Sequence, residues 1–156
     1  MSGSDLNKAL SLILENLGEA DLVGPRAPEL LDQIEALLGG RFPRLYRDFL
    51  EQYGAGNIRS FEVFGVVDDN LEKGCVPNGA WLTNIERQSG VLPMNLFIIG
   101  DTGDGDYYCL DMLSTDESAV YVFHFNGEHG QFSCERVFAD FGAYLLAGVK
   151  QAVGLG

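Results

Sequence analysis

Three aspartates separated by glycines are the residues of this chain whose spacing comes nearest to a ligand set. They are Asp101, Asp104 and Asp106, within the segment IIGDTGDGDYYCLDM at residues 98–112. A calcium loop of the EF-hand type needs oxygen ligands at its first, third and fifth positions and a glutamate at its twelfth. Counted from Asp101, the third and fifth positions are glycines and the twelfth is Met112; counted from Asp104, the fifth is a tyrosine. The spacing therefore argues against calcium.

The same segment is typical of a β-hairpin. The apolar run Leu96–Ile99 predicts a strand covered on both faces, and residues 107–112 alternate as a second strand does. Gly103 and Gly105 can adopt the positive φ that a turn between two strands requires. A solvated turn gives carboxylates none of the burial that raises a pKa, so the pattern favours an acidic turn over a carboxylate pair for acid–base catalysis.

The two histidines, His124 and His129, are five residues apart across a predicted turn. Such a pair could share a zinc ion, with Glu128 and Cys134 as the nearest further ligands. No Cys or carboxylate pair has the usual spacing of a zinc site, however, and no phosphate-binding loop or dinucleotide fingerprint is present. We therefore expect no metal and no cofactor, and we interpret the histidines as a surface pair.

The cysteines and the N-terminal residues bear on where the protein is found. Cys75, Cys109 and Cys134 contain no CxxC pair and none lies in an activating context, so they predict reduced thiols without a catalytic role. No apolar stretch approaches the roughly 20 residues that span a bilayer, and residues 1–10 lack the pattern of a signal peptide. We expect a cytoplasmic protein that does not enter membranes.

Composition limits the class of partner. The chain has 156 residues, 46% of them hydrophobic, which is enough for one well-packed core and short for two. Ten basic residues against 23 acidic ones give a net charge of −13, which repels nucleic acids and anionic membranes. The same charge would speed encounter with a basic protein, although acidic proteins are also common simply because they are soluble.

The periodicity of apolar residues predicts an α+β fold in a single domain, residues 1–156, with helices packed on an antiparallel-dominated sheet. Helices are predicted over residues 4–17, 28–38, 43–53 and 137–149, and strands over residues 61–67, 96–99, 107–112, 119–125 and 131–134. Trp81 lies in the stretch CVPNGAWLTN, which looks irregular; the residue is either a core or sheet-edge aromatic or an exposed anchor for a partner.

Several segments, taken in order, resemble the SUKH superfamily, which includes the fungal Smi/Knr cell-wall-assembly regulators and many bacterial immunity proteins. They are IEALLGGRFPRLYRDFLEQYGAGNI at 34–58, FEVFGV at 61–66, LPMNLFIIGDTGDGDYYCLDM at 92–112 and VFADFGAYLLAGV at 137–149. The Gly-Asp-rich turn is the most specific of them. The resemblance covers about residues 28–150, so the helix at 4–17 is an N-terminal extension.

This resemblance implies a protein without a shared catalytic set, which in bacteria neutralises a secreted toxin by binding its toxic domain. The toxin would be a nuclease or another enzyme with a basic face, and inhibition would be stoichiometric. One alternative is a regulatory scaffold of the cell-wall type that binds an endogenous protein. Another is an enzyme or small-molecule binder that uses the carboxylates and histidines.

Charge and predicted exposure, rather than the resemblance, select the residues expected to bind the partner. Acidic loop and turn residues would steer and pair with basic groups of the toxin, and an aromatic residue would anchor the centre of the interface. The acidic residues are Asp68, Asp69, Glu72, Asp101 and Asp104, and the aromatic ones are Trp81 and Tyr107.

Overall fold

The computed structural model describes residues 2–125 and 132–156. His129 and Glu128 lie outside these residues, so the predicted histidine pair stays a prediction. The helices of the described part are α1 (Ser2–Glu15), α2 (Pro28–Leu38), α3 (Arg44–Tyr53), α4 (Gly79–Gln88) and α5 (Phe141–Ala152), with a 3-10 turn at Leu17–Glu19. The strands are β1 (Ala20–Leu22), β2 (Gly56–Ile58), β3 (Phe61–Val63), β4 (Leu96–Asp101), β5 (Tyr107–Asp111), β6 (Val120–Phe125) and β7 (Phe132–Phe138). The predicted α+β class is confirmed.

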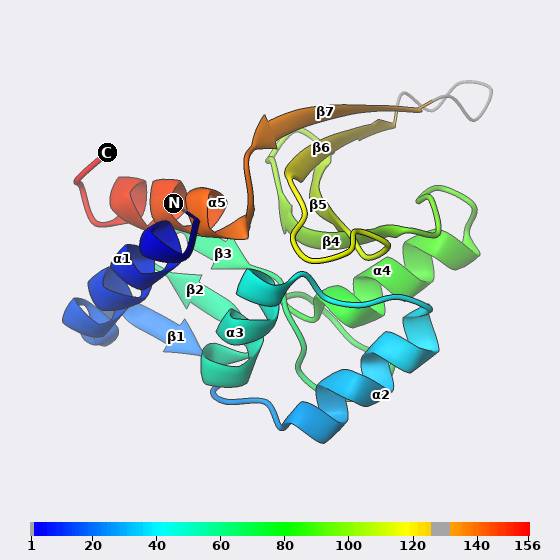
Figure 1. Ribbon diagram of the computed structural model, residues 1–156, viewed down its shortest axis with the longest axis horizontal. Coiled ribbons are helices and arrows are strands. Elements are labelled where there is room, and N and C mark those ends of the chain that lie inside the picture. Colours follow the sequence, from blue (N-terminus) through cyan, green and yellow to red (C-terminus); the bar gives the residue numbers. More distant parts are fainter. Residues whose placement is uncertain (1, 126–131) are drawn as a thin grey trace.

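The larger sheet is the predicted antiparallel meander, with strand order β4-β5-β6-β7 (Figure 1). Strand β4 lies between two groups of buried side chains, because Phe97 and Ile99 join the main core whereas Leu96 and Ile98 join a smaller one. The prediction that this apolar run is covered on both faces is therefore confirmed. Gly103 and Gly105 have φ of 87° and 91° in the turn that connects β4 to β5, as the hairpin requires.

A second sheet, with order β1-β2-β3, was not predicted. Each of its strands has three residues, too few to show the alternation by which strands are recognised. β1 lies in a stretch that looked like a loop, and the strand predicted over residues 61–67 ends at Val63. Beyond it the chain is held by single contacts, such as the bridge between Gly65 and Asn78.

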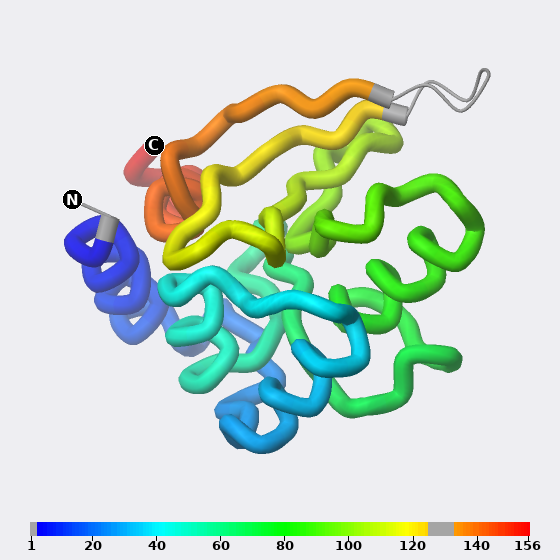
Figure 2. Tube along the Cα trace, turned by 45° about the vertical axis from the view of Figure 1, so that its right-hand side comes forward, coloured from blue at the N-terminus to red at the C-terminus, as the bar shows by residue number. Residues whose placement is uncertain are grey.

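Proline and glycine mark the ends of two helices as expected. Pro28 begins α2, and Gly39 ends it with a left-handed φ of 79°. Pro43 precedes α3, and Gly54 ends that helix. Figures 1 and 2 both show α1 lying beside α5, so the two ends of the chain form one layer over the smaller sheet. Among the described residues, no helix combines the length and the apolar character needed to cross a membrane.

Two predicted boundaries were wrong, each because a local signal was misread. The stretch around Trp81 is the helix α4, which Asn78 caps by accepting the backbone N–H of Trp81 at 3.2 Å. The helix predicted from Val137 begins at Phe141, because residues 132–138 form the edge strand β7. Asp140 caps this helix by accepting the N–H of Ala143 at 2.9 Å.

Candidate functional site

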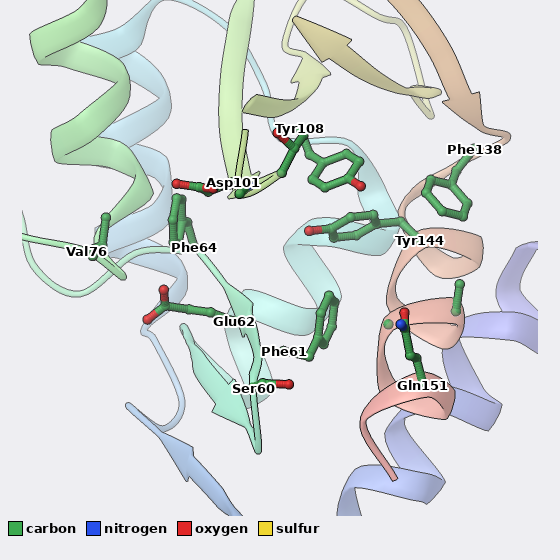
Figure 3. A pocket seen from close by; sticks show the side chains of 14 residues that line it. Ser60, Phe61, Glu62, Phe64, Val76, Asp101, Tyr108, Phe138, Tyr144 and Gln151 are labelled. Carbon is green, nitrogen blue, oxygen red and sulfur yellow. Dashed lines mark hydrogen bonds between the residues drawn. The ribbon is translucent and has the colours of Figure 1, made fainter. Parts of the chain in front are cut away.

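An open groove of about 490 Å³ lies where the two sheets and the last helix meet (Figure 3). β3 forms one wall, the end of β4 with the following turn forms a second, and α5 forms the third. The side chains with polar or aromatic groups that line it are Ser60, Phe61, Glu62, Phe64, Asp101, Thr102, Tyr108, Phe138, Tyr144 and Gln151. Pockets of this size suit a small ligand or one large side chain.

The local sequence explains how these groups come together. Glu62 is the middle residue of the short strand β3, and Asp101 is the last residue of β4, where the chain turns toward solvent. Gly100 precedes Asp101 because the hydroxyl of Tyr144 occupies the space that a Cβ at this position would need. Gly148 likewise leaves room on α5 for the ring of Phe61. Both glycines therefore serve the close approach of an aromatic ring to the backbone.

The groove is acidic. Its fourteen lining residues include the carboxylates of Glu62 and Asp101 and no Lys, Arg or His. Burial raises the pKa of Glu62 above its ordinary value, and the nearby charge of Asp101 raises it further. In the described part of the chain, neither carboxylate forms an ion pair. The groove therefore holds negative charge that the protein itself does not compensate.

Aromatic rings form the wall beside these carboxylates. The ring of Tyr144 lies 5.1 Å from Tyr108, 5.7 Å from Phe61 and 5.6 Å from Phe138, measured between centroids. Tyr144 is 4% exposed and points from α5 toward the side of the groove where Asp101, Phe64 and Glu62 lie. Within the described residues its hydroxyl has no hydrogen-bond partner, and burial raises its pKa well above the ordinary value. In the described residues the fully buried side-chain polar atom without a partner is Arg87 Nε, so the Tyr144 hydroxyl itself is open to the groove although its ring is buried.

The raised pKa of Glu62 predicts that Glu62→Gln becomes more stabilising as pH rises. Because the pKa of Glu62 is raised in the folded state, the folded protein binds a proton at Glu62 more readily than the unfolded chain does. Proton binding at Glu62 therefore contributes fully to stability below the ordinary carboxyl pKa, and this contribution is lost as pH rises through the pKa of the folded state. Glutamine is neutral throughout. The variant's gain in free energy of unfolding should therefore increase between about pH 4 and pH 7 in urea titrations.

Glu29→Gln, an exposed substitution on α2, is the matched control for that series. A difference between the Glu62 variant and the unmodified protein that stays constant across the same pH range would show that burial does not act on Glu62.

The predicted partner-binding residues fall into separate places. Asp101 lines the groove, and Asp104 is exposed at the tip of the turn beside it. Asp68, Asp69 and Glu72 are exposed in the loop that follows β3, where Asp69 and Glu72 line a different hollow together with Leu37 of α2. The structure therefore places these acidic residues in two surface regions, and their role in binding stays a prediction.

The two aromatic candidates are both partly buried. Trp81 packs on the backbone of Gly74, whose missing side chain leaves room for the indole. Tyr107 donates its hydroxyl to Glu86 at 3.0 Å, and burial followed by the charge of Glu86 raises its pKa to about 12. Tyr107 thus already has a hydrogen-bond partner inside the protein, whereas the hydroxyl of Tyr144, which the sequence did not single out, has none among residues 2–125 and 132–156.

The third aspartate of the turn has a partner on a neighbouring strand. Asp106 Oδ2 lies 2.8 Å from Nδ1 of His124 on β6, and Glu135 Oε2 of β7 lies 3.7 Å from the other ring nitrogen. The hydrogen bond with Asp106 raises the pKa of His124. In the part of the chain that the structure describes, no group of three His, Cys, Asp or Glu side chains could hold a metal ion.

Asp106→Asn should lower the pKa of His124 toward its ordinary value, because it removes the carboxylate that favours the imidazolium. Glu135→Gln should lower that pKa less, because its oxygen lies farther from the ring. Titration of the ring C–H signals by NMR measures both shifts. A larger decrease in the Glu135 variant than in the Asp106 variant would contradict this order.

The groove residues that sequence analysis missed share one property. Glu62, Tyr108 and Tyr144 come from three elements far apart in the chain, and each belongs to a pattern that predicts only a strand or a helix face. The one available signal was Gly100, a glycine at the end of an otherwise continuous apolar run, which marks a close approach to the backbone.

Comparison with known families supports the resemblance seen in the sequence. The family model SUKH_6, described as SMI1-KNR4 cell-wall, matches residues 28–145, well over half of the chain. No protein with a curated function matches. The matched residues include α2, α3, the smaller sheet's β2 and β3, the β4–β5 hairpin with Asp101, and the start of α5 with Tyr144. The chain therefore belongs to the SMI1-KNR4 family of the SUKH superfamily.

Proposed function

We propose that this protein is a cytoplasmic immunity protein that binds a cognate secreted toxin and neutralises it by stoichiometric occlusion. The observation that supports this proposal most is the acidic groove, because two carboxylates without a basic neighbour in its lining suit a basic surface on another molecule. Membership of the family agrees with a role in protein binding. The toxin would be a nuclease or another enzyme whose active site is basic, since such a site must hold phosphates.

Binding in this proposal has two electrostatic parts. The net charge of −13 attracts a basic toxin over long distances, and the exposed loop with Asp68, Asp69 and Glu72 extends that field at the surface. The groove then supplies contact at short range. Rim charges act mainly on the association rate, whereas desolvated pairs act mainly on the dissociation rate.

The decisive experiment uses the toxic domain encoded beside this gene. Co-expression should rescue growth, and the two purified proteins should form a complex of equal stoichiometry on a sizing column. Failure of both rescue and complex formation with that domain would remove the proposal. A complex that forms while the toxin stays active would remove occlusion as the mechanism.

Neutralising the loop should slow association with that toxin by about tenfold at low salt and leave dissociation nearly unchanged. The variant combines Asp68→Asn, Asp69→Asn and Glu72→Gln, and the measurement is surface plasmon resonance at two salt concentrations. Its matched control, which removes the same charge from α1, β1 and α2, combines Glu15→Gln, Asp21→Asn and Glu29→Gln. If both triple variants slow association equally, the net charge of the protein attracts the toxin and the loop has no special role.

The family description, SMI1-KNR4 cell-wall, favours one other function, a regulatory scaffold that binds an endogenous protein. The same groove would serve it. Deletion of the gene distinguishes the two functions: loss of an immunity protein sensitises cells only where the toxin is present, whereas loss of a regulator changes cell-wall assembly without any toxin.

A further inference from the structure

Among the oxygen-bearing side chains that line the groove, three come from different elements, β3, β4 and α5. Glu62 and Asp101 carry the carboxylates, and the Tyr144 hydroxyl faces them from α5. Asp101 uses one oxygen to accept the N–H of Gly103 at 2.5 Å. The hydroxyl of Tyr144 neither donates nor accepts a hydrogen bond within the described residues, although the side chain is 4% exposed. These acceptor oxygens therefore line a space whose lining holds no Lys, Arg or His.

The shape of the groove decides between a metal ion and a larger cation. Two carboxylates supply fewer ligands than a divalent ion takes from a protein site, and the space of about 490 Å³ is far larger than an ion needs. The aromatic residues Phe61, Tyr108 and Phe138 also line this space. Aromatic faces attract organic cations and add apolar contact along an aliphatic stem.

Among organic cations, arginine fits better than lysine. A guanidinium presents five N–H donors in a plane, so it can reach acceptors on two or three sides and still lie against an aromatic ring. An ammonium is a compact point charge that is more strongly hydrated and gains less from the rings. The groove has carboxylate acceptors on β3 and β4 and aromatic rings on α5 and β5, an arrangement that suits a planar guanidinium.

We infer that the groove binds an arginine side chain of the protein partner, with Glu62, Asp101 and the Tyr144 hydroxyl accepting its N–H groups. This inference deepens the proposed function and rests on it for the nature of the partner. Burial of the guanidinium supplies the positive charge that the groove lacks. Removal of that arginine from the partner leaves the carboxylates buried and uncompensated, which makes it a residue of large effect in the interface.

The test uses the full chain and a defined probe, N-acetyl-arginine amide, in an NMR titration. Its matched controls are N-acetyl-lysine amide and N-acetyl-citrulline amide, the second of which has nearly the shape of arginine without the charge. We expect saturable shifts at Glu62, at residues 101–103 and in the rings of Tyr108 and Tyr144. Binding of the citrulline compound should be about tenfold weaker or undetectable, and that of the lysine compound should be intermediate.

Variants assign the contacts. Glu62→Gln and Asp101→Asn should each weaken binding of the arginine compound by about tenfold, because each replaces a charge-assisted hydrogen bond by a neutral one. Tyr144→Phe removes one oxygen, keeps the ring and should weaken binding by a few-fold. Glu29→Gln, on an exposed part of α2, should leave binding unchanged. Circular dichroism confirms that each variant is folded before the titration.

Equal shifts with the citrulline compound, shifts scattered over the acidic surface, or affinity unchanged in Glu62→Gln would overturn the inference. None of these outcomes involves the toxin, so they are separate from a failure of growth rescue. If the toxin complex forms and the groove variants bind it normally, the proposed function stands and the arginine site is wrong. If the arginine compound binds the groove and no toxin complex forms, the proposed function is wrong and the site stands.

Discussion

Gly65→Ala lowers the free energy of unfolding by about 4 kcal/mol or more, which is the range of the most damaging single substitutions. A Cβ at this position would overlap the carbonyl oxygen of Gly54 and lie 3.0 Å from a methyl carbon of Leu50. That carbonyl accepts the N–H of Val66 at 3.1 Å, and the carbonyl of Gly65 accepts the N–H of Gly79 at 2.7 Å. Backbone blocks the methyl group on one side, so relief requires the chain between β3 and α4 to move.

Urea denaturation followed by circular dichroism measures this effect. Gly18→Ala is the matched control, because Gly18 is exposed and no atom lies within 4 Å of the added methyl. The control should change stability by less than about 0.5 kcal/mol. If the Gly65 and Gly18 variants have the same midpoint, the close approach of Gly65 to Gly54 does not exist in solution.

Arg87→Ala has the second largest expected effect, a loss of about 3 kcal/mol. Arg87 is 7% exposed on α4, and its guanidinium donates to the carbonyl oxygens of Leu38 at 2.7 Å and Leu96 at 3.1 Å. Leu38 is the last residue of α2, so the positive charge also meets the negative end of that helix. Alanine leaves both carbonyls without these donors and creates a cavity between α2, α4 and β4.

Two comparisons separate the causes of that loss. Arg87→Met keeps most of the volume and removes the donors, so it should cost less than alanine but still destabilise the fold. Gln88→Ala, at the exposed neighbouring position on the same helix, should have little effect. Because burial lowers the pKa of Arg87, a methionine variant more stable than the unmodified protein would show that desolvating the charge outweighs its hydrogen bonds.

The sequence predicted the elements whose signals are local. The hairpin of β4 and β5 follows from Gly103 and Gly105 between two apolar runs, and α2 and α3 follow from Pro28 and Pro43 ahead of helical periodicity. It missed α4 because Pro77, Asn78 and Gly79 look like a loop, although Asn78 acts as the N-cap. It missed β1 and β2 because a strand of three residues is too short to show the alternation of apolar and polar side chains.

The candidate site was predicted in part. Asp101 was selected by its place in the acidic turn, and it does line the groove. Glu62 and Tyr144 could not be selected, because their proximity depends on the packing of α5 across β3 and on the space at Gly100. The sequence predicts a solvated carboxylate at Asp106. The structure instead pairs it with His124, which lies on a strand whose register the sequence does not specify.

The groove also lies across the junction between the two sheets. β3 belongs to one sheet and β4 to the other, and at this junction the N–H of Phe64 donates to the carbonyl of Ile99 at 2.9 Å. A ligand that contacts both β3 and β4 stabilises the contact between the two sheets. Amide exchange at Phe64 should therefore slow when the groove is filled, and the occupied protein should outlast the empty one under proteolysis and heat.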